Sequence, residues 1–137
     1  MELYEVVDQY QTYPLGAYVM IYEVLDWVFT EGSEQGRQRG HLTGQELAQK
    51  VFLFSVGRYG LLGRMIWEEL NISTSEDVGE IVYHLVDNEL MGKQDTDRKE
   101  DFEGLFTIDD FDQVVMRLKG DRAKELEVEF DIDLRKE

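Results

Sequence analysis

The stretch STSEDVGEIVYHLVDNEL (residues 73–90) carries the clearest structural pattern in the chain and points to the fold class. Ser73 and Glu76 have the spacing of a capping box, in which a hydroxyl accepts a backbone N–H and a carboxylate reaches back to the cap. Gly92 follows where a left-handed residue would end the helix. Apolar residues recur between these signals at helical spacing, which predicts an amphipathic helix; they are Val78, Ile81, Val82, Leu85, Val86 and Leu90.

The same signals recur on the N-terminal side of this helix. Pro14 suits the first turn of a helix that continues to about residue 30. Thr43 and Glu46 form a second capping box, which opens a helix that stops near Gly60. The segment VFLFSV (51–56) by itself is also typical of a buried strand, but the cap and the length of the pattern favour a helix.

Residues 61–70 and 107–120 complete the helical pattern, with Thr107 and Asp110 as the cap of the last helix, and residues 2–10 form either a short helix or a loose arm. No repeat or linker divides the chain. We therefore predict a mostly α-helical fold, a single-domain bundle of four to five helices over residues 1–120, followed by an acidic tail at 121–137.

The tail has a different period. In ELEVEFDIDL (125–134), apolar and acidic residues alternate, which gives an extended strand one apolar and one acidic face. A single strand leaves its backbone groups unpaired, so it needs a neighbouring strand. We predict that the apolar face binds a partner or a second copy of the chain; it comprises Leu126, Val128, Phe130, Ile132 and Leu134.

The charge balance favours a basic partner protein. Lys and Arg number 14 against 30 Asp and Glu, a net charge of −16, so the chain as a whole repels nucleic acid and anionic membranes. The absence of cysteine excludes disulfides, thiolate zinc sites and a cysteine nucleophile. No apolar run approaches the length of a membrane helix and the N-terminus lacks the pattern of a signal peptide, which together predict a cytoplasmic protein.

Several blocks of the chain stand in an order typical of one family. They are HLTGQEL (41–47), YG (59–60), EDVGEIV (76–82), LMGK (90–93) and RKEDF (98–102). Over roughly residues 14–112 the chain resembles a family of small uncharacterised bacterial proteins catalogued under a Minf locus name. It departs from that family at Leu61, where a proline is expected, and in its long tail. The resemblance implies a compact cytosolic domain and supplies no activity, cofactor or catalytic residue.

A locally basic block suggests an alternative function. Residues 36–67 contain five basic residues and one acid, Glu46. If some of the basic side chains share a face, they form an anion site for RNA phosphate or an acidic protein, and the chain is then a nucleic-acid- or ribosome-associated factor. The competing interpretation is that they neutralise acidic segments of the same protein. The candidate anion-binding residues are Arg37, Arg39, Arg58 and Arg64.

No residue pattern indicates catalysis or a bound metal. His41 and His84 lack a nearby second histidine, and His84 lies beside the main apolar stripe of its helix, so surface or partly packed roles are expected. The aspartates of DTDRKED (95–101) depart from the calcium-loop pattern after the second one. The glycines of GRYGLLGR (57–64) lack the strand and the GK[ST] of a phosphate loop, and a tight corner between helices explains them. We expect a non-enzymatic interaction module without a cofactor.

Overall fold

The protein is described by a computed structural model over residues 2–31, 42–92 and 98–118. The α-helices in these ranges are α1 (Leu3–Tyr10), α2 (Leu15–Asp26), α3 (Gly44–Tyr59), α4 (Gly63–Glu69), α5 (Ser75–Asp87) and α6 (Ile108–Leu118). Shorter helical segments are the π-helical η1 (Trp27–Glu31) and the 3₁₀ turns η2 (Gly60–Leu62) and η3 (Lys99–Phe102). The predicted mostly helical fold is confirmed: α2 to α6 are the five expected helices, and α1 shows that the N-terminal segment is a helix. The tail at 121–137 lies outside the described residues.

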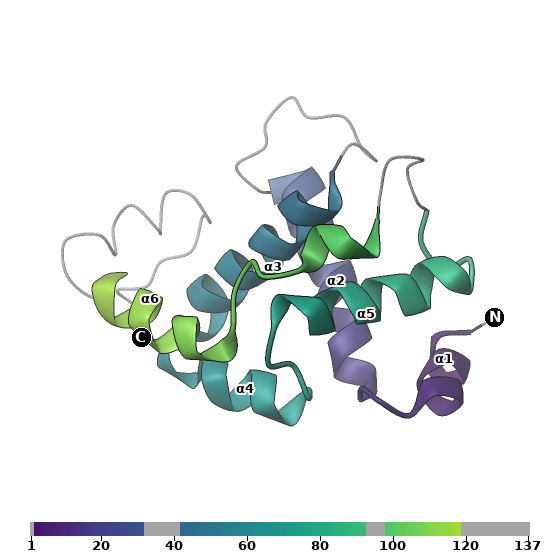
Figure 1. The fold of residues 1–137 in the computed structure, drawn as a ribbon, viewed down its shortest axis with the longest axis horizontal. Coiled ribbons are helices and arrows are strands. Elements are labelled where there is room, and N and C mark those ends of the chain that lie inside the picture. Colours follow the sequence, from purple (N-terminus) through teal and green to yellow (C-terminus); the bar gives the residue numbers. More distant parts are fainter. Residues whose placement is uncertain (1, 32–41, 93–97, 119–137) are drawn as a thin grey trace.

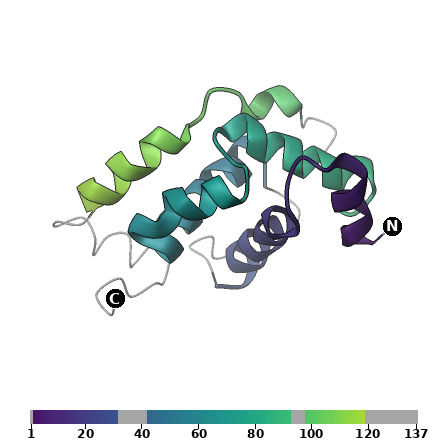
Figure 2. The same ribbon diagram turned by 90° about the horizontal axis from the view of Figure 1, so that it is seen from below.

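Helix α3 lies at the centre of the fold and contacts α2, α4, α5 and α6 (Figure 1). Helices α4 and α6 pack together at one end of the molecule, and α1 lies at the other end beside α2 (Figure 2). The segment VFLFSV (51–56) lies within α3, so helix and not strand is correct. No helix in the described ranges is both long enough and apolar enough to cross a bilayer.

An aromatic cluster fills the core where α3, α4 and α6 meet. Trp67 on α4 is fully buried, with its ring centroid 5.3 Å from that of Phe111 on α6 and 5.9 Å from that of Phe52 on α3. Phe106, which precedes α6, adds a fourth ring at 5.5 Å. The indole N–H donates to the buried Ser55 hydroxyl at 3.0 Å, so the polar atom of this large apolar side chain is satisfied.

The two segments that precede α5 and α6 run side by side. Thr74 and Thr107 form an isolated antiparallel bridge, in which the Ser75 N–H donates to the Phe106 carbonyl and the Ile108 N–H donates to the Ser73 carbonyl. These bonds hold the start of α5 against the start of α6. They pair backbone groups that would otherwise be left over at the ends of helices.

The capping signals agree with the structure in two cases and are shifted in a third. Thr43 and Glu46 form the predicted capping box of α3, and the Asp110 carboxylate accepts the Thr107 N–H at the start of α6. The prediction of Ser73 with Glu76 was wrong, because Thr74 and Asp77 cap α5. Both pairs have the same spacing. Thr74 and Asp77 form the cap, and Thr74 is also the residue that forms the bridge to Thr107.

The end of α5 also differs from the prediction. The helix stops at Asp87, and Glu89, with φ of 61°, takes the left-handed conformation that Gly92 was expected to adopt. Leu90 then donates its N–H to the Leu85 carbonyl at 2.8 Å. This turn closes α5 about one turn earlier than the apolar pattern suggests.

The predicted helix corner at GRYGLLGR (57–64) is confirmed, and Gly63 shows why a glycine stands there. A Cβ atom at Gly63 would lie 1.9 Å from Cζ of Phe111, so the Phe111 ring rests directly on the first turn of α4. Only a residue without a side chain permits this approach. Close packing leaves little room for the ring to move.

We expect Gly63→Ala to lower the free energy of unfolding by about 1–3 kcal/mol, because the clash with Phe111 outweighs the gain of up to ~1 kcal/mol in helix propensity. Urea unfolding measures the change. Gly92→Ala is the matched control, since a Cβ at Gly92 has no neighbour within 4 Å. A Gly63→Ala protein as stable as the wild type would contradict the close contact.

Candidate functional site

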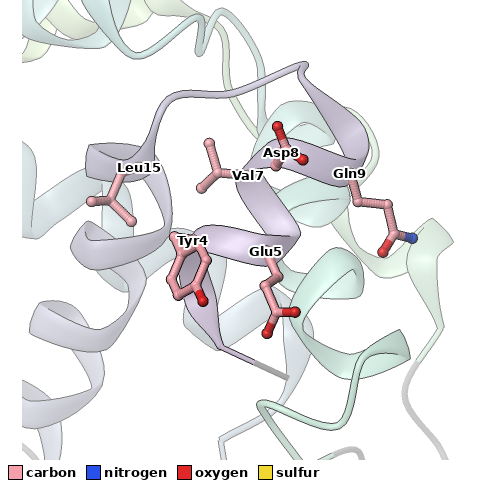
Figure 3. Close-up of a pocket in the computed structure, with 6 residues that line it drawn as sticks. All are labelled: Tyr4, Glu5, Val7, Asp8, Gln9 and Leu15. Carbon is pink, nitrogen blue, oxygen red and sulfur yellow. The ribbon is translucent and has the colours of Figure 1, made fainter.

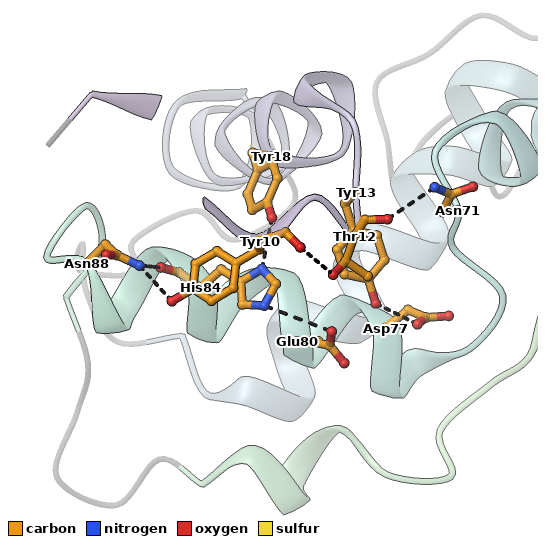
Figure 4. A network of polar contacts seen from close by, with 9 residues as sticks. All are labelled: Tyr10, Thr12, Tyr13, Tyr18, Asn71, Asp77, Glu80, His84 and Asn88. Atoms are coloured by element: carbon orange, nitrogen blue, oxygen red, sulfur yellow. Dashed lines mark hydrogen bonds and ion pairs between the residues drawn. The ribbon is translucent and has the colours of Figure 1, made fainter. Parts of the chain in front are cut away.

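A network of polar and aromatic side chains surrounds His84 on α5 and joins it to α1 and α2 (Figure 4). The Tyr10 ring at the end of α1 stacks on the imidazole, with centroids 3.7 Å apart and planes within 5°. The Tyr18 hydroxyl on α2 lies 2.8 Å from Nδ1 of His84. Asn88, in the turn after α5, donates to both the Tyr10 hydroxyl and the His84 carbonyl. One imidazole therefore connects three helices.

The linker between α1 and α2 is fixed to α5 by a second set of contacts. The Tyr13 hydroxyl donates to Oδ1 of Asp77 at 2.6 Å, while Oδ2 of the same carboxylate accepts the N–H groups of Ser73 and Thr74 at the start of α5. The Asn71 side chain donates to the Thr12 carbonyl at 3.1 Å. A single carboxylate thus caps α5 and holds the linker.

Burial determines the protonation states in this network. Burial lowers the pKa of His84, and Lys99 acts in the same direction, while Glu80 and Asp87 oppose the shift. Burial raises the pKa of Tyr18 to about 12, so the hydroxyl stays protonated near neutral pH. The Tyr18 hydroxyl and Nδ1 of the imidazole share this hydrogen bond, and Nε2 lies 3.9 Å from Oε2 of Glu80.

The network holds α1, α2 and α5 together, and the imidazole at its centre is enclosed by its neighbours. The Nδ1 atom of His84 is occupied by Tyr18, and Tyr10 covers one face of the ring. Among the residues that the structure describes, no group of three or more His, Asp or Glu side chains could hold a metal ion. Of the DTDRKED aspartates, Asp101 lies in a described range, and its carboxylate accepts the Arg98 N–H at 3.1 Å.

The sequence did not reveal this network. A surface or partly packed position was expected for His84, and the structure buries it. Tyr18 and His84 are 66 positions apart, so no local spacing could have paired them. The only available signal was a histidine in an amphipathic helix in a chain whose first 22 residues contain five tyrosines.

Some of the predicted site residues lie outside the described part of the chain, and others lie within it. The five apolar residues of the tail lie beyond residue 118, outside the described part of the chain, as do Arg37 and Arg39 of the basic block. Arg58 is exposed, and its guanidinium lies 4.9 Å from the centroid of the Phe54 ring. Arg64 is the predicted anion-binding residue whose surroundings are best defined.

Arg64 is surrounded by acidic side chains of its own chain. Its guanidinium lies 3.1 Å from Asp109 and 3.3 Å from Asp112 on α6, and 3.6 Å from Glu68 one turn along α4. The hydrogen bond to Asp109 is the largest cause of a raised pKa of Arg64. These contacts agree with the interpretation in which basic residues neutralise acidic segments of the same protein.

A groove between α1 and α2 lies beside the His84 network (Figure 3). Its walls comprise Tyr4, Glu5, Val7, Asp8 and Gln9 on α1 and Leu15 on α2, and its volume is about 650 Å³. Tyr4 is 66% exposed and Leu15 is 47% exposed. Tyr10 at the end of α1 and Tyr13 in the linker both contact α5, so these contacts help to hold α1 in place.

Comparisons of the chain with protein-family models, curated proteins and solved structures found no match. The resemblance to the Minf-named family therefore stays a prediction.

We expect the free energy of unfolding to fall as the pH drops below about 6.5, the ordinary pKa of histidine. Because burial lowers the pKa of His84 in the folded protein, the unfolded chain binds this proton more readily. Above that pH His84 is neutral in both states, and its stabilising contribution is complete. This stabilising contribution is lost as the pH falls from the pKa of His84 in the unfolded chain to its lower pKa in the folded protein.

Urea unfolding of the wild type and of His84→Gln at about pH 7.5 and about pH 5.5 checks this sign. The carboxylates titrate in both proteins, so the difference between them isolates His84. We expect the wild type to lose more stability over this interval than the variant does. An equal loss would mean that His84 is hydrated in the folded state.

Proposed function

We propose that this chain is a cytoplasmic, non-enzymatic protein–protein interaction module, and that the tail is its binding element. The alternating pattern of residues 125–134 carries the proposal. The tail adds a strand to the sheet edge of a basic partner protein, or pairs with the tail of a second copy. Main-chain hydrogen bonds supply affinity in this mode of binding, and alternating side chains fix the register.

The architecture of the helical domain supports this role for the tail. The described residues by themselves form one buried apolar core, which extends from Val6 to Val115. In the described ranges, β-pairing is limited to the isolated bridge between Thr74 and Thr107, which offers no sheet edge for a further strand. A strand at 125–134 therefore needs a neighbour outside this part of the fold.

The acidic face of the tail favours a basic partner. Five acids lie between the apolar positions of ELEVEFDIDL, and complementary charge increases the rate of association and disfavours wrong partners. The nucleic-acid alternative stays a prediction that depends on Arg37, Arg39 and Arg58, because Arg64 already contacts three carboxylates of its own chain.

Substitution of the apolar face in the full-length protein tests the proposal. We expect the triple variant Val128→Ser, Phe130→Ser, Ile132→Ser to lose the partner or the self-association of the wild type, because it removes the side chains that set the register. Affinity capture from cell lysate after nuclease treatment, together with sedimentation velocity of the purified protein, measures both outcomes.

The matched control changes the acidic face alone, by Glu127→Gln, Glu129→Gln and Asp131→Asn. We expect this variant to retain its partner with weaker, less salt-dependent binding. Association that survives the loss of the apolar face would overturn the proposal. A ribonuclease-sensitive partner that is lost on substitution of Arg37, Arg39 and Arg58 would favour the nucleic-acid alternative.

A further inference from the structure

Helix α2 has apolar side chains on two opposite faces, and the fold covers only one of them. Ala17, Tyr18, Ile21 and Val24 are buried against the rest of the protein. On the other face, Leu15, Val19 and Tyr22 are 47%, 38% and 37% exposed. Exposed apolar patches bordered by polar residues mark sites of protein–protein contact. The exposed face of α2 is therefore a surface to which a partner can bind.

The exposed residues of α2 form one stripe that begins at the groove. Positions 15, 19 and 22 are spaced by four and three residues, so their side chains share a face over about 10 Å of helix. Figure 3 shows Tyr4 and Val7 on α1 on the side of the groove that faces Leu15. The Tyr22 hydroxyl donates to the Leu90 carbonyl, which fixes the ring at the far end of the stripe.

The charged side chains that α1 and α2 themselves contribute to this surface are acidic. Glu2, Glu5 and Asp8 are exposed on α1 and its cap, and Glu23 is exposed on α2. Residues 2–31 contain no Lys or Arg, although the chain has 14. An apolar stripe beside the carboxylates of α1 matches a partner with apolar residues on one side and basic residues next to them.

We propose that the surface formed by α1 and α2 binds a basic amphipathic helix of another protein. The apolar residues of such a helix, at positions i, i+4 and i+7, pack on Leu15, Val19 and Tyr22. One edge of the helix lies in the groove beside Tyr4. Its Lys and Arg residues then face Glu5 and Asp8, which line the groove. Grooves between helices accept helices in this way, by ridges-into-grooves packing and apolar anchors.

Charge argues against the other possible occupants. A second copy of the chain would bring the acidic side chains of α1 in both copies together, and like charges in contact oppose association. An anionic bilayer is repelled for the same reason. The surface is also pre-organised, because Tyr10 and Tyr13 fix α1 and the linker to α5; a fixed receptor reduces the entropy lost on binding.

The inference goes beyond the proposed function of the tail, because the α1–α2 surface and the tail are separate parts of the chain. It is tested on the full-length protein with a fluorescent peptide of about 18 residues that forms a Leu/Lys amphipathic helix. Fluorescence anisotropy measures its affinity beside two control peptides, one with Glu in place of Lys and one with the same residues in scrambled order. We expect only the basic amphipathic peptide to bind, and its affinity to fall with added salt.

The double variant Leu15→Gln, Val19→Gln removes the apolar stripe at exposed positions, where substitutions have little effect on folding. We expect it to weaken peptide binding by about tenfold or more. The matched control is Leu61→Gln, Met65→Gln, which changes side chains that are 52% and 60% exposed at the other end of the molecule. We expect this control to bind like the wild type.

The charge requirement has its own variant, Glu5→Gln with Asp8→Asn, in which the amide of residue 5 can still serve the cap at Glu2. We expect weaker binding and a smaller salt dependence. Two results would overturn the inference. The Leu15→Gln, Val19→Gln variant could bind the basic peptide as tightly as the Leu61→Gln, Met65→Gln control does, or the peptide with Glu in place of Lys could bind as tightly as the basic peptide. Self-association of the wild type that Leu15→Gln, Val19→Gln abolishes would overturn it as well, because a second copy would then be the occupant.

Discussion

The burial of Trp67 is the constraint on which the packing of this fold depends. An indole ring loses much of its contact with water only if its N–H group finds a hydrogen-bond partner in the interior. Ser55 supplies that partner on α3, and its own hydroxyl donates to the Val51 carbonyl at 2.9 Å. Aromatic rings from α3, α6 and the segment before α6 complete the surroundings of the indole. The positions of α3, α4 and α6 are therefore fixed together.

The opposite end of the molecule is held by polar groups instead. Tyr18, Tyr10 and Asn88 all contact His84, and Asp77 caps α5 while it accepts the Tyr13 hydroxyl. Buried polar groups of this kind stabilise a fold only when each has its partner. The same contacts help to hold α1 in place beside α2, where the two helices line the groove.

Charge in this protein is distributed in a way that separates its surfaces. Arg64 is directed to acids of its own chain on α4 and α6, while α1 and α2 have acidic groups without any Lys or Arg among them. Net charge far from zero favours solubility and selects partners of opposite sign. A basic partner protein is therefore consistent with both the acidic tail and the α1–α2 surface, although these are built from different kinds of secondary structure.

The helices could be predicted from the amino-acid sequence, because helical periodicity, the Thr43 cap and the glycine corner are interactions between residues a few positions apart. The prediction was wrong by one residue at the start of α5 and by about one turn at its end, where the Thr74 bridge and the left-handed Glu89 set the boundaries. The burial of His84, the ion pairs of Arg64 within its own chain and the exposure of the second apolar face of α2 could not be predicted in this way. Each of these depends on groups far apart in the chain, such as Tyr18 and His84 at a separation of 66 positions. Apolar residues on a helix look alike in sequence, and packing alone determines which of them remain in contact with water.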